Sequence, residues 1–172
     1  MVAQGEVLLT SKRFRIVRKA RRAADGQTHV RDIVEHPGSV VILPLLDDGR
    51  VCLIRNYRIA VDATLIELPA GTLEGEDPLT TARRELIEET GYRARSLEPL
   101  LDFFVSPGIL NERMHLFVAT GLTPGEAELE PGEAIERLEV PWAEALEMIK
   151  TGTIQDAKTL VGLLVYDRWK RA

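Results

Sequence analysis

The chain has 172 residues, of which 45% are apolar and 28% are charged, and its formal net charge is −5. A chain of this length and composition buries enough apolar surface for one globular domain, which excludes a disordered or collagen-like protein. The longest apolar run, residues 40–46, is too short to span a bilayer. The first residues lack a basic stretch followed by an apolar one, so we expect no secretory signal and a cytoplasmic location.

The cysteine count and the charge pattern exclude two further classes. Cys52 is the single cysteine, so no internal disulfide forms, and no Cys/His spacing indicates a zinc site. Seven basic residues lie between Lys12 and Arg22, but they alternate with Phe14 and Ile16, as in a strand with one solvated face. We therefore expect neither a nucleic acid nor a membrane as a partner.

Runs of β-branched and apolar residues predict strands in the first third of the chain. They are Glu6–Thr10, Arg13–Ala20, His29–His36, Ser39–Leu46 and Arg50–Tyr57. The dipeptides Asp25-Gly26 and Asp48-Gly49 each separate two of these runs, and Asp-Gly tolerates the positive φ angles of tight hairpins. The early strands are therefore expected to pair antiparallel.

The clearest helix signal begins at Asp77, an N-cap residue, followed by Pro78 at the first helical position, and ends at Gly91. The later segments predict three more strands and two helices: Leu97–Val105, Arg113–Ala119, Ile135–Val140, Trp142–Lys150 and Asp156–Lys170. This order predicts an α+β fold, with a mixed, mostly antiparallel sheet flanked by helices, in a single domain over residues 1–172.

Three carboxylates gather on one side of the first predicted helix. Glu85, Glu88 and Glu89 lie at i, i+3 and i+4, and only Arg84 is an adjacent base. Such a cluster is either an ordinary solvated face or a site for a hard divalent cation such as Mg²⁺ or Mn²⁺. The glycine-containing loop over residues 69–76 favours the cation site, because it can bring backbone carbonyls near the carboxylates.

These residues together resemble the signature of the Nudix hydrolases: Gly, five residues, Glu, seven residues, then Arg-Glu-apolar-x-Glu-Glu-x-Gly-apolar. The second half matches at every defined position from Arg84 to Tyr92, and Glu76 stands the required eight positions before Arg84. In the first half only four residues separate Gly71 from Glu76, and Ala70 occupies the expected glycine position. We interpret this difference as a one-residue deletion in the loop.

The resemblance covers roughly residues 32–164 and implies the α/β/α sandwich of that family. Within the family, the segments 34–41, 55–58 and 67–71 are similar to the ADP-ribose pyrophosphatase branch. Pro107 lies fifteen positions after Tyr92, the spacing associated with ADP-ribose and ADP-sugar specificity.

The resemblance implies metal-dependent hydrolysis of the pyrophosphate bond of ADP-ribose or a related ADP-sugar to AMP and a sugar phosphate. Two alternatives stay open: a pyrophosphatase of GDP-mannose or another nucleotide sugar, and a non-catalytic nucleotide-sensing Nudix domain. The expected cofactor is Mg²⁺, with Mn²⁺ as the alternative.

The resemblance also implies roles at the metal site. Glu85, Glu88, Glu89 and the carbonyl of Ala70 are expected to bind the metal, and Glu85 and Glu88 are also expected to be catalytic. Arg84 is expected to support the site structurally, because its guanidinium suits the orientation of a carboxylate.

Further roles lie outside the helix. The resemblance implies that Glu133, in an acidic loop before a late strand, is the general base. It also implies substrate contacts by Arg58 and Glu112, and more weakly by Glu74. The alternative for each is an ordinary surface charge or ion pair.

The resemblance finally implies a homodimer. Residues 1–36 would contribute strands to the subunit contact, and residues 37–172 would form the catalytic core. An isolated N-terminal hairpin would be marginally stable, which is consistent with this expectation.

Overall fold

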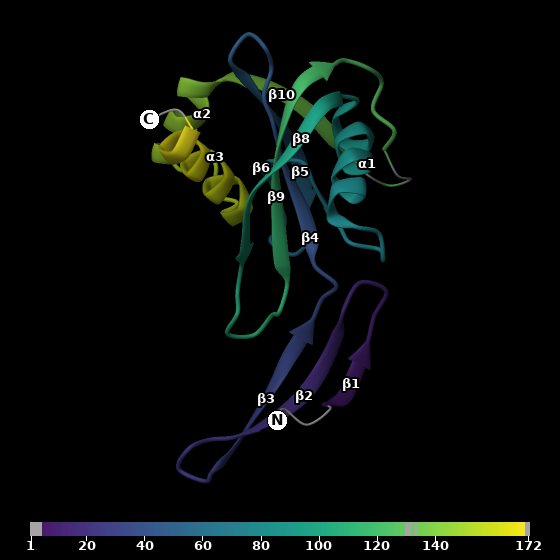
Figure 1. Ribbon diagram of the computed structural model, residues 1–172, viewed down its shortest axis with the longest axis vertical. Coiled ribbons are helices and arrows are strands. Elements are labelled where there is room, and N and C mark those ends of the chain that lie inside the picture. Colours follow the sequence, from purple (N-terminus) through teal and green to yellow (C-terminus); the bar gives the residue numbers. More distant parts are fainter. Residues whose placement is uncertain (1–4, 130–131, 133, 171–172) are drawn as a thin grey trace.

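The computed structural model describes residues 5–129, 132 and 134–170 (Figure 1). Its N-terminal strands are β1 (Glu6–Thr10), β2 (Arg15–Arg22) and β3 (Thr28–Glu35). The strands of the body are β4 (Ser39–Pro44), β5 (Arg50–Arg58), β6 (Ala63–Glu67), β7 (Ala70–Thr72), β8 (Arg93–Phe104), β9 (Arg113–Thr123) and β10 (Ile135–Pro141). The helices are α1 (Pro78–Thr90), α2 (Trp142–Lys150) and α3 (Ala157–Lys170).

Strands β1, β2 and β3 form a three-stranded antiparallel sheet that projects from the body (Figure 1). Its end is attached to the body through the loop before β9. The Val34 N–H donates to the Ile109 carbonyl at 2.8 Å, and the His36 N–H donates to Asn111 Oδ1 at 2.7 Å. These bonds hold the last residues of β3 beside the body.

The body is an α/β/α sandwich, as the successive side chains of β4 show. Val40 and Ile42 pack in the hydrophobic cluster that contains Leu86 of α1. Val41 and Leu43 point the other way, because side chains alternate along a strand, into the cluster that contains residues of α2 and α3. Helix α1 therefore covers one face, while α2 and α3 cover the opposite face (Figure 1).

Two sheets form the central layer. One has the order β10-β5-β6, and the other has the order β7-β4-β9-β8. Among the paired strands of the described residues, β4 and β9 run parallel and the other pairs run antiparallel. The predicted α+β class with a mixed, mostly antiparallel sheet is confirmed. None of the helices in the described residues is long and apolar enough to cross a membrane.

The sequence patterns missed the two short strands β6 and β7. Strand β7 has only three residues, below the length at which alternation is recognisable, and β6 has five. Both matter, because they carry the polypeptide from the end of β5 to the start of the loop before α1.

Local capping determines the limits of α1. Asp77 accepts hydrogen bonds from the N–H groups of Leu79 and Thr80, and Pro78 begins the helix. Gly91 ends it with φ of 74°, in the left-handed region that favours glycine, and its N–H donates to the Ile87 carbonyl.

Replacement of Gly91 by alanine should destabilise the protein more than the same change at Gly152. Both glycines have positive φ, 74° and 73°, so each variant pays about 1–2 kcal/mol for the left-handed conformation. A Cβ at Gly91 would also lie 2.2 Å from the Gly125 carbonyl oxygen, whereas a Cβ at Gly152 meets nothing within 4 Å. Urea unfolding should show that Gly91→Ala lowers the free energy of unfolding by about 2 kcal/mol more than Gly152→Ala does. Equal losses would contradict this packing.

Candidate active site

An open cavity of about 490 Å³ lies between α1, the loop that follows β7, and the tip of the β1–β2 hairpin. Its lining brings together acidic and basic side chains from segments far apart in the sequence. The charged residues that line it are Lys12, Arg13, Arg58, Glu74, Arg84, Glu85, Glu88, Glu89, Glu112 and Lys158. The cavity therefore has both an acidic wall, from α1, and basic groups around it.

Arg84 organises the acidic wall. Its guanidinium lies 2.9 Å from Glu85 Oε1 and 2.6 Å from Glu88 Oε2, with Glu76 Oε2 at 3.5 Å. Partial burial alone would lower the pKa of Arg84, but the charges of Glu85 and Glu88 outweigh it and raise that pKa. Arg84 therefore stays charged, and it orients the Glu85 and Glu88 carboxylates along α1.

Strand β7 lies directly against α1. The Ala70 N–H donates to Glu89 Oε2 at 2.9 Å, and the Glu89 side chain is buried, with 6% of the residue exposed. A Cβ at Gly71 would lie 1.9 Å from Glu85 Cδ. Only glycine at this position lets the backbone approach Glu85 so closely.

The donor atoms at this place fit a hard divalent cation. Glu85, Glu88 and Glu89 all line the cavity, Ala70 adds backbone beside them, and oxygen is the ligand that Mg²⁺ and Mn²⁺ prefer. The described residues contain no ready-made group of three His, Cys, Asp or Glu side chains around a common point. A cation here would therefore draw on backbone oxygen, water or substrate phosphate as well as on the carboxylates.

Glu112 lies on another part of the wall, where a hydrogen bond from Ser39 holds it. The Ser39 hydroxyl donates to Glu112 Oε1 at 2.6 Å, and His36 Nδ1 lies 3.4 Å from the same oxygen. The Gly38 N–H donates to that Nδ1 at 3.2 Å. The carboxylate is thus oriented by Ser39, which lies 73 positions earlier in the chain.

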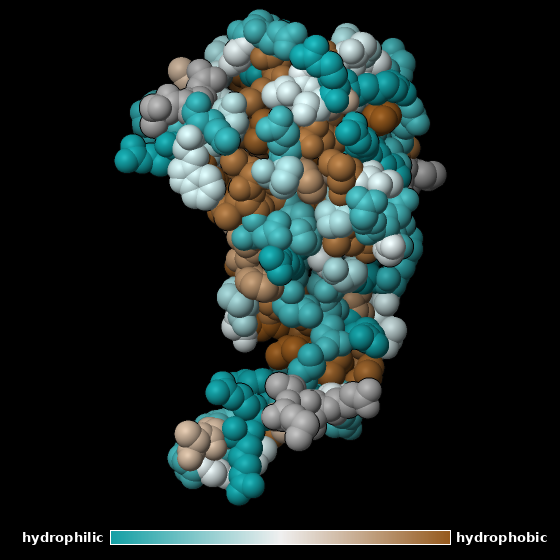
Figure 2. Space-filling view, viewed as in Figure 1, coloured by the Kyte–Doolittle hydropathy of each residue, from teal (hydrophilic) through white to brown (hydrophobic). Residues whose placement is uncertain are grey.

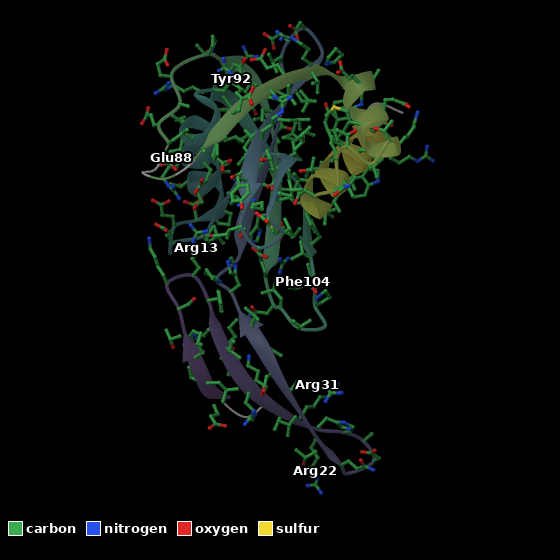
Figure 3. The ribbon with its side chains drawn as sticks, turned by 180° about the vertical axis from the view of Figure 1, so that it is seen from behind. Arg13, Arg22, Arg31, Glu88, Tyr92 and Phe104 are labelled. Atoms are coloured by element: carbon green, nitrogen blue, oxygen red, sulfur yellow. The ribbon has the colours of Figure 1, made fainter. Side chains whose placement is uncertain are left out.

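The tip of the N-terminal hairpin also reaches the cavity. Lys12 and Arg13 line it, and Figure 3 shows Arg13 at this tip, next to the end of the body where α1 and Glu88 lie. The predicted solvated strand face is present at Arg18, which is exposed and pairs with Asp32 within the N-terminal sheet. The two residues at the turn instead face the cavity.

The structure brings nearly all the predicted site residues into one place. Arg58, Glu74, Glu112 and Ala70 line the same cavity as Arg84 and the α1 carboxylates. Glu133 lies outside the described residues. Sequence reasoning missed Lys12, Arg13, Ser39 and Lys158, for which the only available signal was the presence of a basic or polar residue in an otherwise ordinary segment.

Comparisons with known proteins agree with this geometry. The NUDIX domain family model matches residues 35–161. The chain is 41% identical over 138 residues to ADP-ribose pyrophosphatase of Bacillus subtilis (strain 168), which covers 78% of this chain and 75% of the relative. It is 38% identical over 149 residues to GDP-mannose pyrophosphatase of Cronobacter sakazakii, covering 80% and 78% of the two chains.

The chain is also similar to a second Bacillus protein and to a solved structure. The chain is 42% identical over 142 residues to the methanol dehydrogenase activator of Bacillus methanolicus, covering 81% of this chain and 77% of the relative. The crystal structure of an ADP compounds hydrolase superposes with a TM-score of 0.85 at 22% identity, covering 99% of this chain and 94% of that one. This last similarity shows the shared fold.

The α/β/α sandwich, the α1 carboxylates in the cavity and these similarities together define a phosphate-anhydride hydrolase. The chain belongs to the Nudix family and is a Nudix hydrolase.

Replacement of Gly71 by alanine should reduce kcat/KM about 100-fold with little loss of fold. The new Cβ would displace Glu85 from its place against β7, and a displacement of about 1 Å in a catalytic group has an effect of that size. Steady-state kinetics and thermal unfolding measure the two properties. Gly108→Ala is the control, since a Cβ there meets nothing within 4 Å. Full activity of Gly71→Ala would contradict the close approach.

Proposed function

We propose that the protein hydrolyses the pyrophosphate bond of ADP-ribose or a related ADP-sugar, producing AMP and a sugar phosphate. The observation that carries the proposal is the cavity in which the α1 carboxylates lie beside Arg58, Lys158 and the hairpin-tip cations. A nucleoside diphosphate sugar needs both: cations bound by carboxylates at the pyrophosphate, and basic side chains for the remaining phosphate charge. The similarity to ADP-ribose pyrophosphatase supports the substrate class.

The proposed metal is Mg²⁺, held by Glu85, Glu89 and the Ala70 carbonyl, with Glu88 as a further ligand. When bound, it would neutralise the pyrophosphate and lower the pKa of an attacking water. Arg84 keeps Glu85 and Glu88 oriented for this purpose.

The other groups have distinct proposed roles. Arg58 binds a phosphate, because it lines the cavity and a guanidinium donates strong hydrogen bonds to phosphate oxygens. Glu112 and Glu74 contact the substrate at the cavity edge. Glu133 receives the proton of the attacking water as general base, and this assignment remains a proposal from the sequence.

A second candidate is hydrolysis of GDP-mannose, which the similarity to GDP-mannose pyrophosphatase favours. A non-catalytic sensing role is the third. The acidic wall argues against it, because α1 retains its three carboxylates in the cavity together with the arginine that orients them.

We also propose a homodimer built through the N-terminal sheet, and a cytoplasmic location. Strand β1 exposes apolar side chains: Val7 is 51%, Leu8 41% and Leu9 48% exposed. Figure 2 shows hydrophobic side chains exposed where this sheet joins the body. Such a surface is unusual for a free monomer and fits coverage by a second copy.

Hydrolysis of ADP-ribose with Mg²⁺ should release AMP, and Glu89→Gln should reduce kcat about 100-fold. The reason is that the amide keeps the size of Glu89 but lacks the charge needed for a cation. Product release would be followed by chromatography over a panel of ADP-ribose, ADP-glucose, GDP-mannose and diadenosine polyphosphates. Glu144→Gln, an exposed glutamate on α2, is the matched control.

The outcomes of this panel separate the three candidates. Turnover confined to GDP-mannose would keep the mechanism and replace the substrate. Tight nucleotide binding without turnover on any member of the panel would favour the sensing role.

The wild-type protein should have the mass of two 19.2 kDa chains in light scattering. Leu9→Arg should shift it toward the monomer, because it places a charge on the exposed apolar strand β1. Leu164→Arg, at an exposed apolar position on α3, is the control and should leave the mass unchanged. A monomeric wild type would refute the dimer.

A further inference from the structure

A fully buried carboxylate lies behind the basic part of the cavity wall. Glu67, the last residue of β6, is 0% exposed and is not among the residues that line the cavity. A buried carboxylate is costly unless it is paired and hydrogen-bonded. The hydrogen-bond partners of Glu67 therefore indicate its role in the structure.

Those partners are two cations that do line the cavity. Arg58 donates from Nε to Glu67 Oε1 at 2.8 Å and from Nη2 to Oε2 at 2.7 Å. The Lys158 ammonium donates to Oε2 and lies 2.9 Å from Asp156 Oδ1. One carboxylate thus holds both a guanidinium and an ammonium beside the cavity.

The local fold holds Lys158 in place independently of any ligand. Asp156 accepts hydrogen bonds from the N–H and hydroxyl of Thr159, which organises the first turn of α3. The Leu68 N–H donates to the Thr159 hydroxyl at 2.7 Å. The first turn of α3 is therefore attached to the residue that follows Glu67.

The bidentate contact also orients Arg58. The bonds to Glu67 use Nε and Nη2, which leaves the Nη1 side of the guanidinium for another anion. Without a carboxylate between them, Arg58 and Lys158 would repel each other, since both are positively charged. Burial alone would raise the pKa of Glu67, but the bonds to Arg58 and the charge of Lys158 outweigh it and lower that pKa.

We propose that Glu67 is a positioning residue that holds Arg58 and Lys158 together as a two-cation clamp for a phosphate of the substrate. The proposal rests on the function proposed above, because it assigns the clamp to a nucleoside diphosphate sugar. Glu67 itself touches no substrate, as it does not line the cavity.

A purely electrostatic role for Glu67 predicts the opposite effect on binding. Removal of its negative charge makes the cavity more positive, which should strengthen binding of an anion and lower KM. Loss of a positioning group should instead raise KM, because Arg58 and Lys158 are no longer held in a binding geometry. The direction of the change in KM therefore distinguishes the two roles.

The experiment compares Glu67→Gln with wild type in steady-state hydrolysis of ADP-ribose with Mg²⁺. We expect KM to rise about tenfold while kcat stays within about threefold, since a charge-assisted hydrogen bond pair is lost away from the reacting atoms. In the Arg58→Ala background, Glu67→Gln should raise KM by less than it does in wild type, because one of the two cations through which it acts is already absent. An unchanged or lower KM, or full additivity with Arg58→Ala, would overturn the proposal.

The matched control is Glu139→Gln. Glu139 on β10 accepts hydrogen bonds from Arg50 at 2.6 Å and from the Tyr92 hydroxyl at 2.5 Å, and it does not line the cavity. It belongs to the same sheet as Glu67, so it reports the general cost of removing a paired carboxylate there. We expect an unchanged KM for this variant.

A measurement without substrate separates this proposal from the proposed function. The Arg58 Nε–H signal in ¹H–¹⁵N spectra, assigned by its loss in Arg58→Lys, should be protected from solvent exchange in wild type and in Glu139→Gln. It should lose this protection in Glu67→Gln. Exchange in wild type as fast as that of exposed arginines would overturn the clamp, even if Glu67→Gln does not fold. Absence of turnover in wild type would instead count against the proposed function alone.

Discussion

The site depends on the close approach of the β7 backbone to the carboxylates of α1. The Ala70 N–H binds Glu89, and Gly71 leaves room for Glu85 where a Cβ would lie 1.9 Å from its Cδ. Like charges that are one helical turn apart repel each other, so they need donors and cations around them. The β7 amide supplies one donor, and Arg84 supplies the nearest positive charge.

The repulsion between like charges also explains why acidic and basic side chains lie on different parts of the cavity wall. Carboxylates on α1 attract a divalent cation, whereas an anionic substrate needs basic groups beyond it. The fold separates the two sets by taking them from different elements. Arg58 comes from β5, Lys158 from α3 and Arg13 from the hairpin tip, while the carboxylates come from α1. Glu67 prevents the first two cations from repelling each other.

Local signals predicted the helices and hairpins well. Asp77, Pro78 and Gly91 act through hydrogen bonds and φ angles within a few residues, so α1 was predicted with its observed limits. Within α1, Ala82 and Leu86 are buried, while Leu79 is 37% exposed. Strands β6 and β7 were missed, because short strands are stabilised by their neighbours, β5 and β4, more than by their own composition.

The sequence by itself determined the family and the acidic wall. The helical period of 3.6 residues places Glu85, Glu88 and Glu89 on one side of α1 whatever surrounds them, and the caps set where that helix begins and ends. Only the tertiary structure decided which cations face that wall. Glu67 and Lys158 are separated by 91 positions, and their contact depends on how α3 packs beside the end of β6. No local pattern encodes this contact, because it arises from the packing of whole elements against one another.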